Sequence, residues 1–215
     1  MIFVMEKIKE TLILSNSDKD INTAIKLLKE GKVICFKTDT IYGFSCDATN
    51  KDACKQIVDI KGRENKPFIL LAKNKEMVYN LATNISKQAN CLMENVWPGP
   101  ITIILDLKYE FCDEVTAGKN TIGLRVPNDP LCNKILTKLD FPIVSTSANI
   151  SGQQPLNDFY DIFKTFNGKV DAIIDSGKVE NNIASTICIA TNDNLNVIRE
   201  GAITTSKIMS LINKI

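Results

Sequence analysis

Short apolar runs alternate with amphipathic stretches along most of the chain. Four of these apolar runs are predicted to be buried strands: Val33–Phe36, Phe68–Leu71, Ile101–Leu105 and Phe141–Val144. Helical patterns lie between them, and some connections are too short for the crossover that joins two parallel strands. The pattern therefore predicts an α/β domain with a mixed, twisted sheet and flanking helices.

Two helices have clear boundaries in the sequence. In the first, over residues 18–30, Ser17 or Asp18 is placed to cap the N-terminus and Gly31 to end the helix. The apolar positions of this helix recur at helical spacing, at Ile21, Ala24, Ile25 and Leu28. The second helix begins after Asn50 or Thr49 and ends before Gly62.

The remaining elements follow from the same periodicities. Helices are predicted near residues 75–82, 85–96, 130–139 and 157–166, with a last one from about residue 205. Further strands are predicted at 121–127, 172–174, 185–189 and 197–198.

Polar residues follow two of the buried strands directly. The run Ser145–Gly152 comes after Phe141–Val144, and Lys37–Gly43 comes after Val33–Phe36. In open α/β sheets, ligands bind beyond the carboxyl ends of the strands, so these segments are candidate ligand sites. A hydroxyl-rich turn that caps its own backbone is the alternative for Ser145–Gly152.

The composition bounds the class of protein. With 215 residues and 44% apolar content, the chain is expected to form one domain over residues 1–215. It has no apolar run long enough to span a membrane, and Met1–Met5 is too short for a signal peptide, so we expect a cytoplasmic protein without membrane contact. A net charge of +1 gives no strong signal for nucleic-acid binding.

Cysteine and histidine usage limits the chemistry. The seven cysteines are scattered, mostly within apolar runs, and form no C-x-x-C pair, so we expect small core residues rather than a zinc site or disulfides. The chain has no histidine, which excludes Ser-His and Cys-His nucleophiles and histidine-ligated metals. Catalysis would have to rely on positioning, cations and carboxylates.

Arginine is scarce, which makes each arginine a candidate for a site. Of 26 basic residues, only Arg63, Arg125 and Arg199 are arginine. The planar guanidinium binds a carboxylate or phosphate at two points, as lysine does not. Lys61 and Arg63, two residues apart in an extended segment, can converge on one anion. The alternative is that they complement the dipole of the preceding helix.

Common nucleotide and hydrolase motifs are missing from the sequence. No Walker A, G-x-G-x-x-G, G-x-S-x-G or EF-hand pattern occurs. Any phosphate would therefore have to be held in another way, and the Lys61 and Arg63 pair with hydroxyls at strand ends is physically sufficient.

Seven blocks in a fixed order resemble one known family. They are Lys37–Phe44, Lys61–Arg63, Trp97–Thr102, Gly123–Pro127, Ser145–Gly152, Ser185–Thr186 and Arg199–Gly201. Together, within residues 18–201, they resemble the YrdC-like family, the threonylcarbamoyl-AMP synthases. The resemblance implies a single YrdC-like domain, similar to the short form of the family without a further C-terminal domain.

The resemblance also implies a reaction. Members of the family convert L-threonine, bicarbonate or CO2, and ATP into threonylcarbamoyl-AMP and pyrophosphate, with Mg2+. A partner complex then transfers the threonylcarbamoyl group to an adenosine of tRNA. Such chemistry suits a chain without histidine, because threonine supplies its own amine nucleophile and adenylation depends mostly on alignment and charge.

The family's site residues carry over onto this chain position by position. The implied L-threonine contacts are Thr38, Tyr42, Arg125 and Ser185, and the implied catalytic residues are Lys61 and Arg63. The implied ATP contacts are Lys61, Arg63, Thr116, Ser145, Ser147, Asn149 and Arg199. Mg2+ would lie with the ATP phosphates near Ser147 and Asn149.

The chain departs from the family pattern at three positions, and two other functions remain open. Lys37, Glu64 and Ala184 stand where the family commonly has proline. One alternative is an RNA-binding module of the same fold, with weak or transient RNA contact. The other is the carbamoyl-transfer module of hydrogenase maturation proteins, whose chains are longer and carry cysteine-rich zinc segments.

Overall fold

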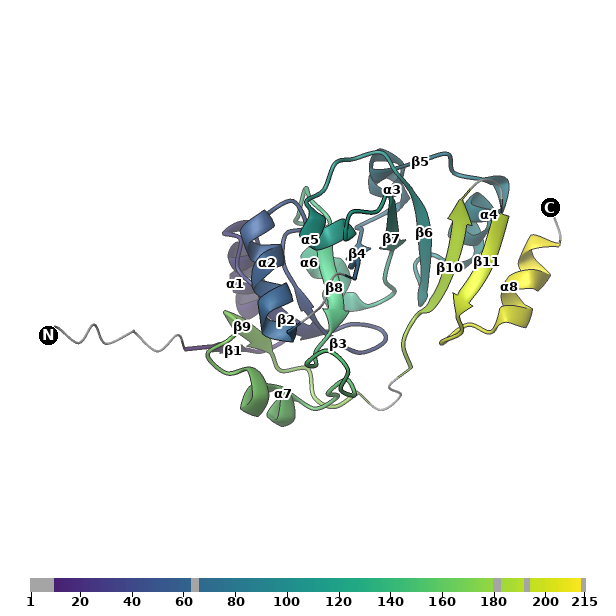
Figure 1. Cartoon of the computed structure of the whole chain (residues 1–215). Helices are drawn as coiled ribbons and strands as arrows, with labels where there is room; N and C mark the ends of the chain where they lie inside the picture. The colour runs from purple at the N-terminus through teal and green to yellow at the C-terminus, as the bar shows by residue number, and fades with distance from the viewer. Residues whose placement is uncertain (1–9, 63–65, 180–182, 192–193, 214–215) are drawn as a thin grey trace, which may run out of the picture.

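A single mixed sheet organises the molecule. The computed structural model describes residues 10–62, 66–179, 183–191 and 194–213. Within these residues, eleven strands form one sheet in the order β1-β9-β2-β3-β8-β4-β7-β6-β10-β11, and β5 pairs with β6 off this path (Figure 1).

The strands and helices have the following bounds. The strands are β1 (Leu12–Leu14), β2 (Ile34–Lys37), β3 (Tyr42–Ser45), β4 (Ile69–Leu71), β5 (Ala82–Thr83), β6 (Ile101–Leu107), β7 (Thr121–Arg125), β8 (Ile143–Ser147), β9 (Ala172–Ile174), β10 (Thr186–Thr191) and β11 (Asn194–Arg199). The helices are α1 (Asp18–Lys29), α2 (Lys51–Lys61), α3 (Lys75–Leu81), α4 (Lys87–Val96), α5 (Asp113–Thr116), α6 (Pro130–Leu136), α7 (Phe159–Phe166) and α8 (Thr205–Ile212).

The mixed character of the sheet, predicted from short connections, is confirmed. Strands β4 and β7 are parallel, as are β6 and β10. Strands β2 and β3 form an antiparallel pair joined by a short loop, and β8 runs antiparallel to both β3 and β4. The central strands therefore come from distant parts of the chain.

The predicted helix boundaries agree with the observed caps. The Ser17 side chain accepts a hydrogen bond from the Asp20 backbone N–H at the start of α1, and Asn50 does the same for Ala53 in α2. Gly62 ends α2 with φ of 54°, in the left-handed region that favours glycine. Each cap satisfies backbone groups that the helix itself leaves unpaired.

Several elements differ from the prediction. The sequence pattern missed β1, β3, β5 and α5, which are short and lack a full period. The strand predicted to end at Val144 continues to Ser147, because Ser145 pairs with Ile69 and Thr146 with Phe44. Pairing on both sides of β8 therefore fixes this hydroxyl-rich segment as strand.

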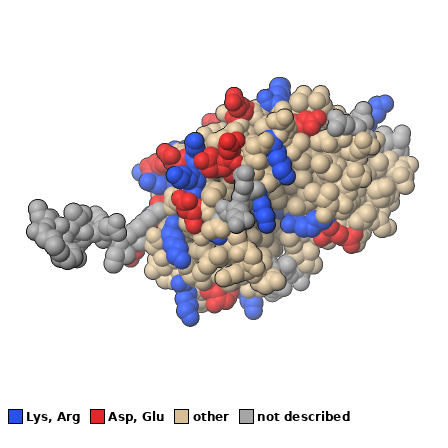
Figure 2. All heavy atoms as spheres, in the orientation of Figure 1, with Lys and Arg blue, Asp and Glu red and all other residues tan. Residues whose placement is uncertain are grey.

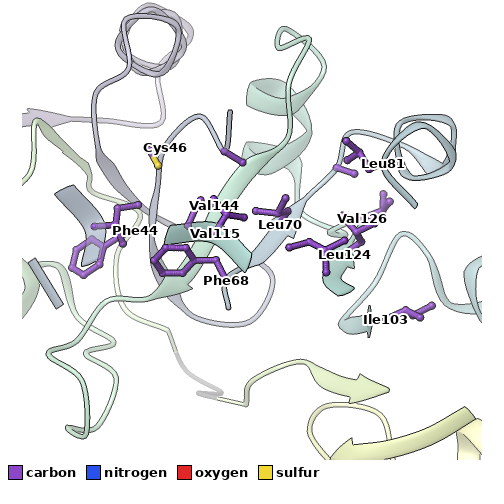
Figure 3. Close-up of a cluster of buried hydrophobic side chains, with 14 of the residues drawn as sticks. Phe44, Cys46, Phe68, Leu70, Leu81, Ile103, Val115, Leu124, Val126 and Val144 are labelled. Atoms are coloured by element: carbon purple, nitrogen blue, oxygen red, sulfur yellow. The ribbon is translucent and has the colours of Figure 1, made fainter. Parts of the chain in front are cut away.

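The hydrophobic core lies on one face of the central strands. Figure 3 shows Leu70, Leu124 and Val144, which come from three adjacent strands and are fully buried. A second cluster joins α1 and α6 to the strands at the β1 edge of the sheet. Along β7, Ile122 and Leu124 are in the core, so Thr121, Gly123 and Arg125 point to the opposite face.

Most of the cysteines lie in the core, and the helices are those of a protein without a membrane-spanning helix among its described residues. Five cysteines are buried, as predicted for small core residues: Cys35, Cys46, Cys54, Cys132 and Cys188. All seven are free thiols, and burial raises the pKa of Cys46 well above its usual range. Among the helices of the described residues, none has the length and apolar character to cross a membrane.

Candidate ligand-binding site

A pocket of about 490 Å³ lies over the face of the sheet opposite the main core. Strands β3, β4, β6, β7, β8, β10 and β11 all contribute to its lining. Side chains at alternate positions of one strand line it, such as Thr102 and Ile104 of β6. The pocket thus lies over the sheet itself, and residues of both predicted strand-end segments line it: Thr40 and Ile41 after β2, and Ser145–Ser147. The expectation that a ligand binds beyond the carboxyl ends of the strands stays a prediction.

The charges that line the pocket are all positive. Lys119, Arg125 and Arg199 are among the lining residues, and the described lining contains no aspartate or glutamate. Hydroxyl-bearing residues also line the pocket: Thr40, Thr102, Thr121, Ser145, Thr146, Ser147 and Ser185. Cations with many hydroxyl donors and no acid form a surface that favours anions.

Arg125 is held from three sides at the buried end of β7. Its Nε donates to the Gly99 carbonyl at 3.1 Å, and its Nη1 donates to Thr40 Oγ1 at 3.1 Å. Its Nη2 forms an ion pair with the Asp39 carboxylate. The side chain is 5% exposed, so its orientation is fixed by protein contacts rather than by solvent.

Arg199 lies near Arg125 at the edge of the same pocket. Its Nη2 donates to the Ser185 carbonyl at 2.7 Å, and its Nε donates to the same oxygen at 3.2 Å. Partial burial and the positive charge of Arg125 lower the pKa of Arg199. Two guanidinium groups that repel each other in one pocket create a place where an anion is stabilised.

A hydroxyl pair completes this end of the pocket. Ser185 Oγ and Thr102 Oγ1 are 2.9 Å apart and both residues are buried. Arg199 Nη2 also lies 3.3 Å from Ser185 Oγ and donates to it. Ser185 is thus oriented by two partners and still lines the pocket, where its hydroxyl can meet a ligand.

Two glycines allow the backbone to approach these arginines closely. A Cβ at Gly99 would lie 2.2 Å from the Val96 carbonyl oxygen, so only glycine fits where the Gly99 carbonyl accepts from Arg125. A Cβ at Gly201 would lie 2.3 Å from the Ala184 carbonyl oxygen. Both glycines occur in blocks that the sequence analysis singled out, and packing explains their presence there.

Lys61, predicted to bind phosphate, points into the protein. Its Nζ donates to the Ser147 carbonyl at 2.6 Å, the Asn149 carbonyl at 2.9 Å and Asn149 Oδ1 at 2.9 Å. The residue is 3% exposed and is not among the described residues that line the pocket. In this arrangement the ammonium ties α2 to the segment that follows β8.

Asn149 has a capping role, whereas Ser145 and Ser147 line the pocket. The Asn149 Nδ2 donates to the carbonyls of Ile150 at 3.0 Å and Gln153 at 2.6 Å. Of the two alternatives for Ser145–Gly152, the ligand site therefore fits its first half and the self-capping turn fits its second half.

Three further predicted contacts are buried away from the pocket lining. Tyr42 accepts from the Ser176 backbone N–H at 2.9 Å and donates to the Gly177 carbonyl at 2.8 Å. Thr38 Oγ1 bonds within its own loop, at 2.9 Å to the Ile41 carbonyl. Thr116 Oγ1 donates to the Cys112 carbonyl at 3.4 Å. These hydroxyls hold loops in place.

Some site residues escaped the sequence analysis, and one prediction cannot be placed. The pocket is also lined by Thr40, Thr102, Lys119 and Gly123, and Asp39 lies behind Arg125. The alternation of β7 could have indicated Gly123, since it shares a face with Arg125, which was already selected. Arg63 lies outside the described residues.

The described residues do not form a protein site for a divalent cation. They contain no group of three or more histidine, cysteine, aspartate or glutamate side chains arranged to hold a metal. Asn149 Oδ1, a predicted Mg2+ neighbour, accepts from the Lys61 ammonium and, at 2.5 Å, from Ser147 Oγ. Mg2+ prefers carboxylate, water and phosphate oxygens, so this cluster does not fit it as a protein ligand set.

Sequence comparison with known proteins identifies relatives along most of the chain. The family model Sua5/YciO/YrdC, described as "Telomere recombination", matches residues 26–201. A threonylcarbamoyl-AMP synthase of Bacillus subtilis (strain 168) is 32% identical over 204 residues, covering 94% of this chain and 59% of its own length. A putative threonylcarbamoyl-AMP synthase of Methanocaldococcus jannaschii is 35% identical over 184 residues, covering 85% of this chain and 86% of its own length.

Comparison with solved structures agrees with these matches. The crystal structure of P. abyssi Sua5 complexed with L-threonine has a TM-score of 0.88 and 29% identity, covering 95% of this chain and 61% of that chain. This chain thus spans about three fifths of the length of the Bacillus relative and of the P. abyssi structure. Sequence, fold and pocket together show that the chain belongs to the Sua5/YciO/YrdC family.

Proposed function

We propose that this protein is an L-threonylcarbamoyladenylate synthase, a nucleotidyltransferase. The observation that carries the proposal is the pocket lined by Lys119, Arg125 and Arg199 with no acidic side chain among its described lining residues. The substrates threonine, bicarbonate and ATP are all anionic or carry a carboxylate. Relatives named threonylcarbamoyl-AMP synthase support the same assignment.

In this proposal, threonine binds at the arginine end, defined as Arg125, Arg199 and Ser185. Arg125 takes the carboxylate through its planar fork, and Ser185 offers a hydroxyl oriented by Thr102 and Arg199. A solved relative was crystallised with L-threonine, which supports an amino-acid site in this fold. The predicted contacts Thr38 and Tyr42 then act indirectly, by shaping the loops around the pocket.

ATP occupies the rest of the pocket and also reaches Arg199, the ATP contact that the resemblance implies at the arginine end. Ser145 offers a hydroxyl group to the phosphates, and Lys119 adds a positive charge. Ser147 also lines this part of the pocket and would have to turn its hydroxyl from Asn149 Oδ1 to donate to a phosphate. Arg63, outside the described residues, remains a proposed phosphate contact. Mg2+ enters only as the ion that accompanies ATP, since the described residues contain no cluster of acidic, histidine or cysteine side chains that could hold a metal.

The proposed chemistry needs no side-chain nucleophile. The threonine amine attacks the carbon of CO2, one C=O bond opens to carry the negative charge, and a proton leaves the nitrogen for solvent, which gives a carbamate. Starting from bicarbonate, the same step also expels one water molecule. A carbamate oxygen then attacks the α-phosphorus of ATP, the bond to the bridging oxygen breaks, and pyrophosphate leaves. The cations offset the charge that develops on the phosphates, which is the main catalytic need of such a transfer. The product would serve a tRNA-modifying threonylcarbamoyl transferase complex.

A direct assay tests this function. Purified protein is incubated with ATP, Mg2+, L-threonine and labelled bicarbonate, and both pyrophosphate and the labelled AMP adduct are measured. The proposal expects both products only when threonine and bicarbonate are present together. Pyrophosphate release that is independent of threonine, or no labelled adduct, would contradict it.

An RNA-binding module of the same fold is the second candidate, and the charge distribution disfavours it. Figure 2 shows acidic and basic side chains next to one another over the part of the molecule that carries α1 and α2. With a net charge of +1, tight binding to phosphate backbones is not expected. Filter binding of tRNA at rising salt decides between the two, because a steep loss of affinity with salt favours the RNA-binding module.

A further inference from the structure

Asp39 lies behind Arg125 as seen from the pocket. It belongs to the loop between β2 and β3, and its carboxylate accepts from Arg125 Nη2 and, at 3.2 Å, from the Asn128 backbone N–H. Its side chain is 11% exposed. Arg125 lines the pocket, whereas Asp39 is not among the described lining residues. The acid therefore contacts a pocket-lining cation without itself lining the pocket.

The donors of Arg125 can be counted. A guanidinium carries five N–H groups. Bonds to Gly99, Thr40 and Asp39 use one N–H on each nitrogen. Within the described residues, one N–H on Nη1 and one on Nη2 are left without a protein acceptor. Two such donors match the two oxygens of a carboxylate.

Asp39 also sets the charge of this part of the pocket. Arg125 and Arg199 are close enough for the charge of one to affect the other. With Asp39 the three side chains carry a net charge of +1, which a single carboxylate neutralises. Without Asp39 the charge would be +2, and Arg125 would be free to turn, because only Gly99 and Thr40 would hold it.

We propose that Asp39 is a positioning residue that directs Arg125 toward the pocket and tunes the arginine end for one substrate carboxylate. The inference rests on the proposed function, in which that carboxylate belongs to threonine. Asp39 does not touch the ligand; it acts through Arg125. Removing it should therefore weaken threonine binding much more than ATP binding.

The test compares Asp39→Asn, Asp39→Ala and the matched control Asp140→Asn, which changes a fully exposed aspartate that pairs with Lys73. Pyrophosphate release gives KM for threonine and for ATP, and calorimetry gives the affinity for L-threonine and for L-threoninamide, which lacks the carboxylate. Asp39→Ala is expected to raise KM for threonine roughly 30-fold, and Asp39→Asn, which can still accept from Arg125, roughly tenfold, with KM for ATP within about twofold.

The preference of the protein for threonine over threoninamide should shrink by similar factors, whereas the control keeps it. An unchanged preference and an unchanged KM for threonine in both Asp39 variants would overturn the inference. A lower KM in Asp39→Asn would also overturn it, since Asp39 would then compete with the substrate. If Asp39→Ala does not fold, Asp39→Asn decides alone.

The experiment distinguishes a failure of the proposed function from a failure of the inference about Asp39. An unaltered chain that binds threonine but releases no pyrophosphate contradicts the synthase activity, and the calorimetric comparison still tests Asp39. An unaltered chain that shows no preference for threonine over threoninamide overturns the inference itself.

Discussion

Two regions of this molecule carry the residue types of a ligand site, and they use them in opposite ways. In the Lys61 network, formed by Lys61, Ser147 and Asn149, the ammonium is buried and donates to three oxygens of the chain itself. At the arginine end, Arg125 and Arg199 are also bound to protein oxygens but line the pocket.

The difference follows from the shape of the two cations. An ammonium has three donors at one point, and three nearby oxygens satisfy all of them. A guanidinium spreads five donors around a plane, so it can be anchored on one side and bind a ligand on the other. A lysine in a motif can therefore be taken up by bonds within the chain where an arginine in a motif still faces the pocket.

The largest expected effect concerns the Lys61 network. Lys61→Met should lower the free energy of unfolding by about 3 kcal/mol, because three buried acceptors lose their donor. Urea denaturation measures this loss. Lys134→Met, which removes an exposed pair with Asp18, serves as control and should leave stability nearly unchanged, because solvent screens exposed ion pairs. If Lys61→Met keeps full stability but loses activity, Lys61 contacts the ligand. The proposed difference between Lys61 and the two arginines would then be wrong.

A substitution at the arginine end should change the catalytic constants rather than the free energy of unfolding. Arg125→Lys keeps the charge and loses the fork, so kcat/KM for threonine should fall about 100-fold, equal to about 2.7 kcal/mol. The same variant should keep KM for ATP within about threefold, since the proposed phosphate contacts lie elsewhere in the pocket. Steady-state pyrophosphate release measures both constants. An equal rise in the two KM values would mean that Arg125 does not distinguish the substrates.

Tyr42, like Lys61, is buried and bonded within the chain, and it should make the stability of the fold depend on alkaline pH. Burial raises the pKa of Tyr42 to about 12, above the ordinary value of 10.0. A raised pKa favours the neutral phenol in the folded state, so this stability is complete below pH 10 and is lost as pH rises toward 12. The loss should reach about 2 kcal/mol.

Chemical denaturation at several pH values measures it, with Tyr42→Phe as the matched variant. This variant starts less stable, because the Ser176 and Gly177 bonds are gone, and should show a smaller decline over the same range. Parallel curves for the two proteins would contradict a buried structural role for Tyr42.

The smallest effect belongs to the exposed cation of the pocket. Lys119→Ala should raise KM for ATP about threefold at low salt and less at high salt, because exposed charges are screened. The control is Lys138→Ala, an exposed lysine that does not line the pocket. If KM for ATP changes equally at low and high salt, or changes equally in Lys138→Ala, Lys119 does not contribute its charge to ATP binding.

Much of the fold could be predicted from local patterns. The caps at Ser17 and Asn50 and the left-handed Gly62 follow from chemistry within a few residues, and the structure agrees with them. The extension of β8 through Ser147 could not be predicted, since it depends on pairing with Ile69 and Phe44 from distant segments. Short strands such as β1 could not be predicted either, because three residues are too few to show the alternation of a strand.

The candidate site was predicted in part. The scarcity of arginine selected Arg125 and Arg199, and both line the pocket; their contacts with threonine and ATP stay predictions. Asp39 was overlooked because its importance comes from a partner 86 residues away. Thr38, Tyr42 and Thr116 were selected as contacts, and they still await a test in a ligand complex.

By itself, the sequence determined the α/β class, the helix boundaries, the absence of histidine chemistry and the few residues able to grip an anion. These properties depend on residue type and short-range spacing. Only the tertiary structure decided which face of the sheet holds the pocket and which cations turn toward it. Whether a charged side chain serves a ligand or the chain itself depends on which oxygens lie within about 3 Å, and the fold brings those oxygens from distant segments.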